Sequence, residues 1–250
     1  MDPEIGRTAV GMGGVMFVVL PLLFVGIIAL GIYFAVKAFK EAKRRKAAIA
    51  SVVAQYGLGY LPEDRERTRY FTSTPFGIGD NRRARDVVWG EFDGRAFETF
   101  AYSYETETTD SDGNTTTTTH RFQVTWVPLP ARLPTLRLTA DNKLKRLGKK
   151  LGARDLDTES HEFNQRWKVW YQDERVAHAM LTPRMIERFL APDTAGRGYV
   201  FEGNALFTYK QGVSDLADIR EVVSRLHDTV DLVPKFLFED PVPGSSTASV

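Results

Sequence analysis

The N-terminal part of the chain is a long apolar stretch that carries no charge. No Asp, Glu, Lys or Arg lies in the 28 residues from Ala9 to Val36. About 20 apolar residues already span the hydrocarbon core of a bilayer, so this run predicts a transmembrane helix over residues 9–36. A cleavable signal peptide has a shorter apolar part with basic residues before it, whereas Asp2 and Glu4 precede this run. We therefore expect a retained anchor.

The helical pattern continues beyond the apolar run. Apolar residues recur at three- and four-residue steps as far as Tyr56, and Gly57 stands where glycine commonly ends a helix. This pattern predicts a basic helical stalk over residues 37–57. Residues 58–84 are rich in charge, proline and glycine, which predicts an irregular linker into the folded domain.

Alternating aromatic residues then predict antiparallel strands. Asp93-Gly94 is a preferred two-residue hairpin turn, and the strands that follow each carry one aromatic face. These faces are formed by Phe100, Tyr102 and Tyr104, and by Phe122, Val124 and Trp126. A three-residue loop, Asp112-Gly113-Asn114, would pair Tyr104 with Phe122 and bring the two faces together on one side of the sheet.

The rest of the chain alternates between strands and short helices. The expected elements are a strand at 135–139, an amphipathic helix near 143–151, a strand at 163–171, helices capped by Asp173 and Thr182, a hairpin around Gly203-Asn204, and a helix from Ser214 to Pro234. Hairpins followed by helices predict an α+β fold with a mainly antiparallel sheet and packed helices. The expected organisation is a short extracytoplasmic N-terminus at 1–8, a transmembrane helix at 9–36, a basic helical stalk at 37–57, a linker at 58–84, a cytoplasmic α+β domain at 85–238 and a disordered tail at 239–250.

The distribution of charge predicts the orientation of the anchor. Residues 37–46 carry a net charge of +5, and only Arg7 is basic before the apolar run. The basic residues are Lys37, Lys40, Lys43, Arg44, Arg45 and Lys46. Because basic flanks stay in the cytoplasm, we expect the domain inside a plasma membrane and the N-terminus outside. The cluster could also bind anionic lipids, but we favour a topology signal, because every single-pass protein of this orientation needs such a flank.

The sequence contains few candidates for chemistry. Asp155-x-Asp157-x-Glu159 imitates a calcium loop, but Ser160 replaces the glycine of position six and Arg166 replaces the glutamate of position twelve. Glu159, His161 and Glu162 form the one candidate polar cluster, but we favour a solvated turn before a strand, which explains these residues with no special chemistry. No zinc, nucleophile or phosphate-loop motif is present, so we predict no metal, no cofactor and no catalytic residue. Residues 47–250 have a net charge of −3, which argues against nucleic acid as a partner.

Three short motifs carry a resemblance to a known family. They are Leu129-Pro130-Ala131-x-Leu133-Pro134, Glu159-Ser160-x-Glu162-Phe163-Asn164 and Leu181-x-Pro183-Arg184-Met185. Over about residues 10–235 the chain resembles uncharacterised bacterial single-pass membrane proteins of actinobacterial type. The resemblance implies a bacterial plasma membrane, but it implies no activity. Read from the residues alone, Phe163 would be buried and Asn164 or Glu159 would bond the local backbone.

Two hypotheses for function follow. In the first, the protein is a membrane-anchored interaction or scaffold module with the bilayer and an unidentified protein as partners. Small residues at four-residue spacing in the span, such as Gly31 and Ala35, also allow a homo-oligomer. In the second, the domain is an enzyme or a small-ligand binder with a site between sheet and helices, for which Glu159, His161 and Glu162 are the candidates.

Overall fold

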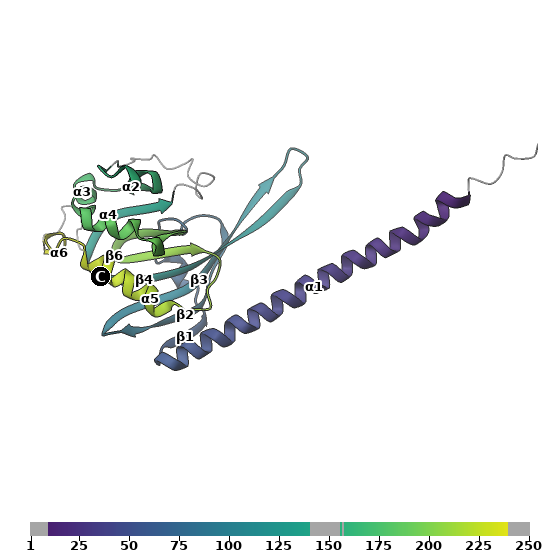
Figure 1. Ribbon diagram of the computed structural model, residues 1–250, viewed down its shortest axis with the longest axis horizontal. Coiled ribbons are helices and arrows are strands. Elements are labelled where there is room, and N and C mark those ends of the chain that lie inside the picture. Colours follow the sequence, from purple (N-terminus) through teal and green to yellow (C-terminus); the bar gives the residue numbers. More distant parts are fainter. Residues whose placement is uncertain (1–9, 141–155, 157, 240–250) are drawn as a thin grey trace, which may run out of the picture. The chain divides into compact units, whose positions relative to one another are not determined.

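The computed structural model describes residues 10–140, 156 and 158–239, with the side chains of the first helix described from Phe24 onward. The chain divides into two compact units, Met1–Ala50 and Ser51–Val250. The predicted helix near 143–151, the N-terminal residues 1–8 and most of the predicted tail lie outside the described residues. Figure 1 shows the helices and strands along the chain.

The first unit consists of most of helix α1, Val10–Tyr56. The helix ends at the predicted position, because Gly57 adopts φ +65° and the N–H of Leu58 donates to the carbonyl of Val53 at 3.0 Å. This is the glycine-terminated helix end that satisfies the last carbonyl groups. Among the described residues, none of the helices combines the length and the apolar character that a membrane span requires. The predicted span includes residues 9–23, which lie outside the described side chains, and it remains a prediction.

The second unit is built on a six-stranded antiparallel sheet. Its strands are β1 (Gly59–Glu63), β2 (Asp80–Phe92), β3 (Arg95–Thr109), β4 (Thr115–Ala140), β5 (Trp167–Tyr171) and β6 (Arg197–Gln211). The order is β1-β2-β3-β4-β5, and β6 pairs with β4. The first half of β4 pairs with β3 and its last residues pair with β5, so this one strand joins two parts of the sheet.

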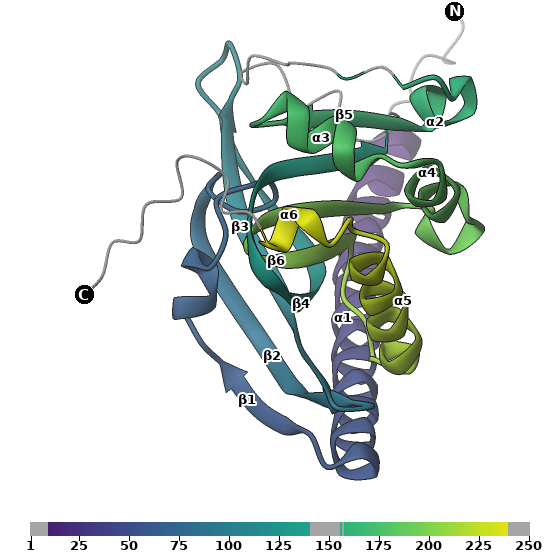
Figure 2. The same cartoon turned by 90° about the vertical axis from the view of Figure 1, so that its left-hand side faces the viewer.

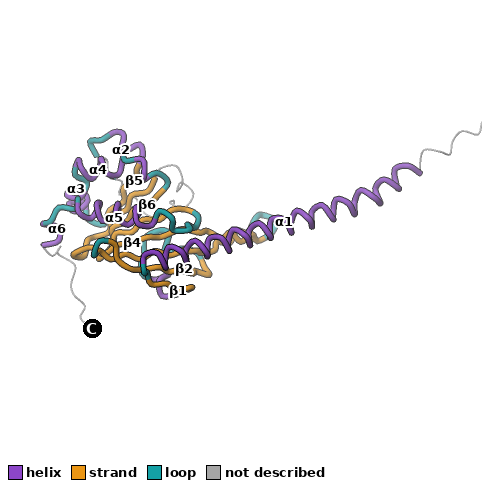
Figure 3. The backbone as a smooth tube through the Cα atoms, turned by 60° about the horizontal axis from the view of Figure 1, so that its bottom comes forward, coloured by secondary structure: helices purple, strands orange, loops and turns teal. Residues whose placement is uncertain are grey.

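Short helices follow the sheet in sequence. They are α2 (His161–Arg166), α3 (Glu174–Met180), α4 (Pro183–Leu190), α5 (Ile219–Asp231) and α6 (Phe236–Glu239), with the 3-10 turns η1 (Glu66–Arg69) and η2 (Pro192–Thr194). The predicted caps are confirmed, because Asp173 accepts from the N–H of Val176 and Thr182 accepts from the N–H of Met185. Helices α2, α3 and α4 gather near β5 (Figures 1 and 3). The expected α+β fold with an antiparallel sheet is therefore confirmed.

The two faces of the sheet are buried by different parts of the chain. Phe100, Tyr102 and Phe207 belong to an aromatic core that includes Phe71 and Phe76 from the segment between β1 and β2. On the opposite face, Thr208 lies against residues of α5, which runs along the β4–β6 side of the sheet (Figure 2). The apolar stripe predicted for the helix from Ser214 to Pro234, of which α5 is the helical part, is buried at every position. Its members are Leu216, Ile219, Val223, Leu226, Val230 and Val233.

The predicted linker is wrong, because residues 58–84 contain β1, η1 and the start of β2. Phe71 and Phe76 are 6% and 1% exposed, and their rings pack on Phe207 and on the residues of β3. Arg67 of η1 also forms an ion pair at 3.0 Å with Glu98, which is 7% exposed. Composition alone suggested a linker, whereas burial of two phenylalanines makes the segment part of the core.

The predicted turn Asp93-Gly94 is confirmed, with φ of +54° and +74°, but the next register is wrong by two residues. Tyr102 lies opposite Phe122, and Tyr104 lies opposite His120. The aromatic residues nevertheless share one face as expected. The loop has three residues, but it begins at Ser111 instead of Asp112, because the backbone N–H of Asp110 bonds the carbonyl of Asn114 at 3.0 Å.

Three further elements differ from prediction. Instead of a separate strand at 135–139, β4 runs through to Ala140 with irregular pairing between Pro128 and Leu136, where prolines cannot donate to the ladder. By contrast, the predicted reversal of the chain around Gly203 is present, because Gly203 has φ +60° and the hydroxyl of Thr208 donates to the carbonyl of Gly198 at 2.9 Å; both halves of β6 also pair with β4. Residues 161–166 form α2, so β5 starts only at Trp167. Helix α5 starts at Ile219, because the hydroxyl of Ser214 accepts from the N–H of Leu216 in a turn.

Candidate functional site

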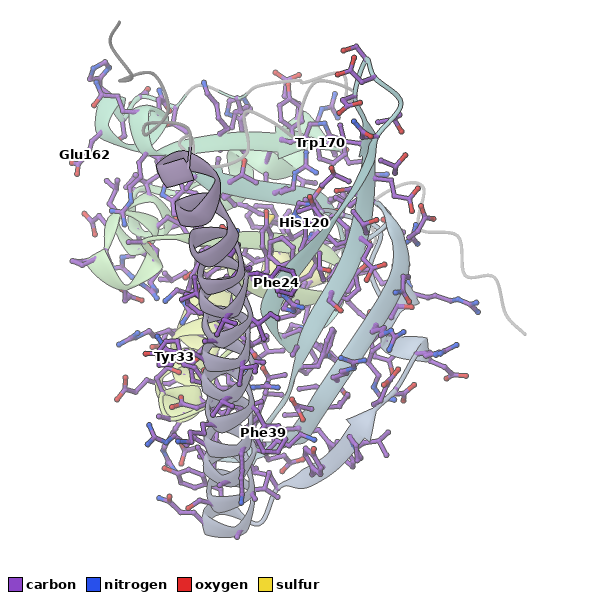
Figure 4. All side chains as sticks on the ribbon, turned by 90° about the vertical axis from the view of Figure 1, so that its right-hand side faces the viewer. Phe24, Tyr33, Phe39, His120, Glu162 and Trp170 are labelled. Carbon is purple, nitrogen blue, oxygen red and sulfur yellow. The ribbon has the colours of Figure 1, made fainter. Side chains whose placement is uncertain are left out.

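The polar cluster predicted from sequence lies at the surface. Glu159, His161 and Glu162 are all exposed, and Glu162 is seen at the periphery in Figure 4. The ring nitrogen Nε2 of His161 is 2.8 Å from Nε2 of Gln165, one helical turn further along. Among the described residues, no group of three or more His, Cys, Asp or Glu side chains could hold a metal ion.

The neighbouring residues of this motif explain it structurally. The hydroxyl of Ser160 accepts from the N–H of Phe163, whose side chain is fully buried. The amide of Asn164 donates to the carbonyl of Thr158 at 2.6 Å and accepts from its N–H at 2.9 Å. The motif therefore caps α2 and closes the turn before it, in agreement with the structural interpretation of Phe163 and Asn164.

Helix α1 presents large apolar side chains to its surroundings between Phe24 and Phe39. They are between 46% and 71% exposed, and Phe24, Tyr33 and Phe39 are seen projecting from the helix in Figure 4. The full set is Phe24, Val25, Ile27, Ile28, Leu30, Ile32, Tyr33, Phe34, Val36 and Phe39. Neighbouring positions in this set point in different directions, so the helix is apolar all round, which is typical of a helix in a membrane or in a protein core.

The predicted basic cluster follows directly on the same helix. Lys37, Lys40, Lys43, Arg44 and Lys46 are exposed, and Arg45 is partly buried. The helix thus changes from an apolar to a basic surface at Lys37. This arrangement places cations at the end of an apolar segment.

The ends of β3 and β4 form a two-stranded ribbon that protrudes from the rest of the sheet (Figure 1). Beyond the pair Asp80–Glu105, β3 has no described partner except β4. Before Arg121, whose carbonyl accepts from the N–H of Gly212 at 2.8 Å, β4 likewise pairs with β3 alone among the described strands. Both edges of the ribbon therefore present unpaired backbone N–H and C=O groups within the described part of the sheet.

The side chains of this ribbon are threonine and acidic residues. From Glu105 to Thr119 the sequence has four carboxylates and no Lys or Arg. The carboxylate of Asp110 accepts from the N–H groups of Asp112 and Asn114 at 3.0 and 2.8 Å. The hydrogen bonds from Asn114, and to a smaller extent the bond from Asp112, lower the pKa of Asp110 below its usual value. The ribbon is therefore a negatively charged strand edge.

The aromatic face of the sheet contains three buried tyrosines whose hydroxyl groups have no hydrogen-bond partner among the described residues. They are Tyr102, Tyr104 and Tyr209, of which the first two are fully buried and the third is 4% exposed. Burial raises the pKa of Tyr102 to about 12, and it raises the pKa of Tyr209 to about 12 while the charge of Arg137 acts in the opposite direction. A buried hydroxyl without a partner costs free energy, so these groups need an explanation.

One of the tyrosines lies beside a half-buried arginine. The guanidinium of Arg137 lies over the ring of Trp170, with Cζ 5.3 Å from the ring centroid. Burial lowers the pKa of Arg137, whereas the nearby Tyr209 and Glu202 raise it. Among the described residues, no carboxylate forms an ion pair with this guanidinium. We call Arg137, Trp170 and Tyr209 the arginine corner.

A second arginine cluster lies on the α5 side of the sheet and is internally satisfied. Arg188 binds Asp193 with both guanidinium nitrogens, at 2.6 and 3.1 Å, and Arg225 lies 3.5 Å from the same carboxylate. Hydrogen bonds and the charge of Arg188 lower the pKa of Asp193. A cavity of about 10 Å³ beside Asp193 and Tyr199 has room for about one water. This cluster supports the fold and offers no space for a larger ligand.

These observations define a class of protein, an antiparallel α+β domain that follows an apolar helix with a basic flank. Residues 115–236 match the model of a family described as a protein of unknown function, DUF3137. The solved structure of the mycobacterial trehalose monomycolate transport factor A, TtfA, is similar with a TM-score of 0.52 and 17% identity, over 80% of this chain and 97% of that chain. At this identity the likeness shows a shared fold. No curated protein matches the chain.

The comparisons support the expected resemblance in its coarser form, a family without assigned activity and a fold shared with a mycobacterial protein. Sequence analysis did not identify the arginine corner. Alternation in the strand predicted at 135–139 does place Arg137 opposite the face of Leu136 and Leu138. Its neighbour Tyr209 lies 72 positions later in the chain, and only the pairing of β4 with β6 brings the two together.

Proposed function

We propose that this chain is a single-pass membrane protein whose C-terminal domain is an interaction module on the cytoplasmic side. The observation that carries the proposal is the apolar surface of α1 between Phe24 and Phe39. Burying one large apolar side chain contributes about 1.5 to 3 kcal/mol. Ten such side chains in water would therefore forfeit on the order of 15 to 30 kcal/mol, which transfer into a bilayer would recover.

The basic residues that follow support the orientation. Lys37, Lys40 and Lys43 lie within the first two turns after Val36, where basic residues hold a flank in the cytoplasm. Membrane association is tested by extraction of isolated membranes. The full chain should resist alkaline carbonate and high salt and should dissolve in detergent. Release by carbonate would contradict the proposed anchor.

Matched variants make this test specific. Lysine in place of both Ile28 and Leu30 should cost at most about 5 to 7 kcal/mol of insertion, because a Lys costs about 2.5 to 3.5 kcal/mol at the centre of a span and less toward its ends. The double variant should appear in the soluble fraction. The control Val213→Lys changes a domain residue that is 43% exposed, and it should stay with the membrane. Protease added to intact cells should leave the domain uncut.

The second part of the proposal concerns the ribbon of β3 and β4, which we expect to contact a partner protein. Its free edges can pair with an extended segment, and its carboxylates favour a segment with basic side chains. TtfA is a transport factor, which agrees with an accessory role for the shared fold. Enzymatic activity is the alternative, and turnover of a metabolite by the purified chain would favour it.

Site-specific photo-crosslinking in cells tests the ribbon. A photoreactive residue at Thr108 or Thr117 should give a discrete adduct, whereas the same residue at the exposed Glu162 should not. Glu105→Gln with Glu107→Gln should weaken the adduct, because the ribbon loses two of its four carboxylates. Absence of an adduct at both threonines, or the same adduct at Glu162, would contradict a role of the ribbon.

A further inference from the structure

Arg137 differs from the other half-buried arginines of the domain. Those arginines donate to, or form an ion pair with, an acceptor of the protein. They are Arg67, Arg83, Arg95, Arg166, Arg188, Arg197 and Arg225. For Arg137, the described part of the chain offers only the π face of Trp170. A guanidinium N–H that leaves water without a protein acceptor loses a hydrogen bond, so the N–H groups of the half-buried Arg137 are available to an acceptor from outside the chain.

The carboxylate whose charge acts on Arg137 is already engaged. Glu202 accepts from the N–H and the hydroxyl of Thr72 at 2.7 and 2.8 Å, and from the N–H of Ser73 at 3.0 Å. These three bonds hold Glu202 against the segment before β2. The charge of Glu202 raises the pKa of Arg137, but its oxygens accept hydrogen bonds from Thr72 and Ser73. Glu202 therefore does not replace an acceptor for the guanidinium.

Tyr209 adds a second donor to the same place. Its hydroxyl is buried and has no hydrogen-bond partner among the described residues. The chain makes room for this ring, because a Cβ at Gly198 would lie 2.3 Å from Cζ and 2.6 Å from the hydroxyl oxygen of Tyr209. Gly198 lies two residues before Val200, which is opposite Arg137 in the sheet. A side chain at position 198 would collide with the ring of Tyr209, so Gly198 allows this ring to lie close to the strand that pairs with Arg137.

We propose that Arg137, Trp170 and Tyr209 form a binding site for a phosphate group. The ring of Trp170 holds the guanidinium by its face, which leaves the N–H groups at the edge free to donate. A guanidinium fork matches two oxygens of a phosphate, and the phenol can donate to a third. A tetrahedral oxyanion therefore suits these donors better than a carboxylate, which has only two oxygens.

The phosphate could belong to a free anion or to a lipid headgroup, and the test separates the two sources. The full chain is purified in a maltoside detergent, which contains no phosphate. It is titrated with inorganic phosphate in one arm and with a short-chain phosphatidic acid in the other. Binding is measured by calorimetry and by tryptophan fluorescence, since Trp170 lies under the guanidinium. This test does not depend on membrane anchoring or on a partner for the ribbon.

Three variants identify the donors. Arg137→Gln should weaken binding about 10-fold or more, because a hydrogen bond to a charged group is lost. Tyr209→Phe should weaken it about 2- to 10-fold, while thermal stability stays equal or rises, because an unpartnered buried hydroxyl has been removed. Tyr102→Phe is the matched control, since it removes a similar buried hydroxyl away from Arg137. It should leave binding unchanged.

Each result has a defined meaning. Binding in either arm that is weakened by Arg137→Gln and Tyr209→Phe but not by Tyr102→Phe supports the site, and the arm with the tighter binding gives the source of the phosphate. No binding in both arms overturns the proposal. Binding that Arg137→Gln leaves unchanged also overturns it, provided that the variant melts like the wild type. If Arg137→Gln fails to fold, Tyr209→Phe alone decides, because it retains the guanidinium.

Discussion

The segment between β1 and β2 should contribute to stability as a part of the core, and Phe76→Ala tests this. The side chain of Phe76 is 1% exposed, and its ring lies 4.4 Å from Tyr102, 5.2 Å from Phe71 and 5.7 Å from Phe207 between centroids. A phenylalanine truncated to alanine in a core costs about 3 to 5 kcal/mol, including the cavity that remains. Because three aromatic partners are lost together, we expect the upper half of this range.

Urea unfolding of the full chain in detergent, followed by tryptophan fluorescence, measures the effect. Trp126 is a suitable reporter, since its ring lies 6.2 Å from that of Phe71. Phe236→Ala is the control, because this phenylalanine is 53% exposed and its loss should change the free energy of unfolding by less than about 0.5 kcal/mol. If Phe76→Ala shifts the urea midpoint no more than the control does, the segment is not part of the core and the argument fails.

Three further predictions follow from single contacts. Burial and the charge of Arg95 lower the pKa of His227 in the folded chain. The stability that this gives is fully present above the ordinary pKa of about 6.5 and should be lost as the pH falls toward the lowered pKa. His227→Gln should abolish this part of the pH dependence of thermal unfolding. Gly94→Ala should cost about 1 to 2 kcal/mol in urea unfolding, because φ is +74° in the turn, and an unchanged midpoint would contradict this. Asp193→Asn weakens the acceptor of Arg188 and should lower the free energy of unfolding by about 1 to 3 kcal/mol in the same assay. An unchanged free energy of unfolding would show that the cluster does not stabilise the fold.

The features that sequence predicted correctly depend on a few neighbouring residues. Asp93-Gly94, Gly57, Asp173 and Thr182 each act within four residues, through a positive φ or a side-chain cap. The face of the aromatic strands was also predictable, because alternation decides which side chains are buried together. These signals need no knowledge of the rest of the fold.

The register shows where such local reasoning ends. Asp110 accepts two backbone N–H groups of the loop, which moves the three-residue loop one position earlier and shifts the pairing by two. A shift of two residues keeps the same side chains on the same face, so the burial argument could not distinguish the two registers. Hydrogen bonds in the loop made the choice, and they were not visible in the apolar pattern.

The bends of β4 and β6 explain why the arginine corner exists and why the sequence did not reveal it. Both halves of β6 pair with β4, and the hydroxyl of Thr208 donates to the carbonyl of Gly198 at 2.9 Å. A straight strand would separate these two residues by about 33 Å, so the bend at Gly203 folds the strand back on itself. Tyr209, from the second half, thereby comes to lie over Gly198, from the first half, two residues before Val200, which pairs with Arg137. The curvature of the sheet thus brings together the donors of the proposed phosphate site. The alternation of apolar and polar residues along a single strand does not predict that curvature.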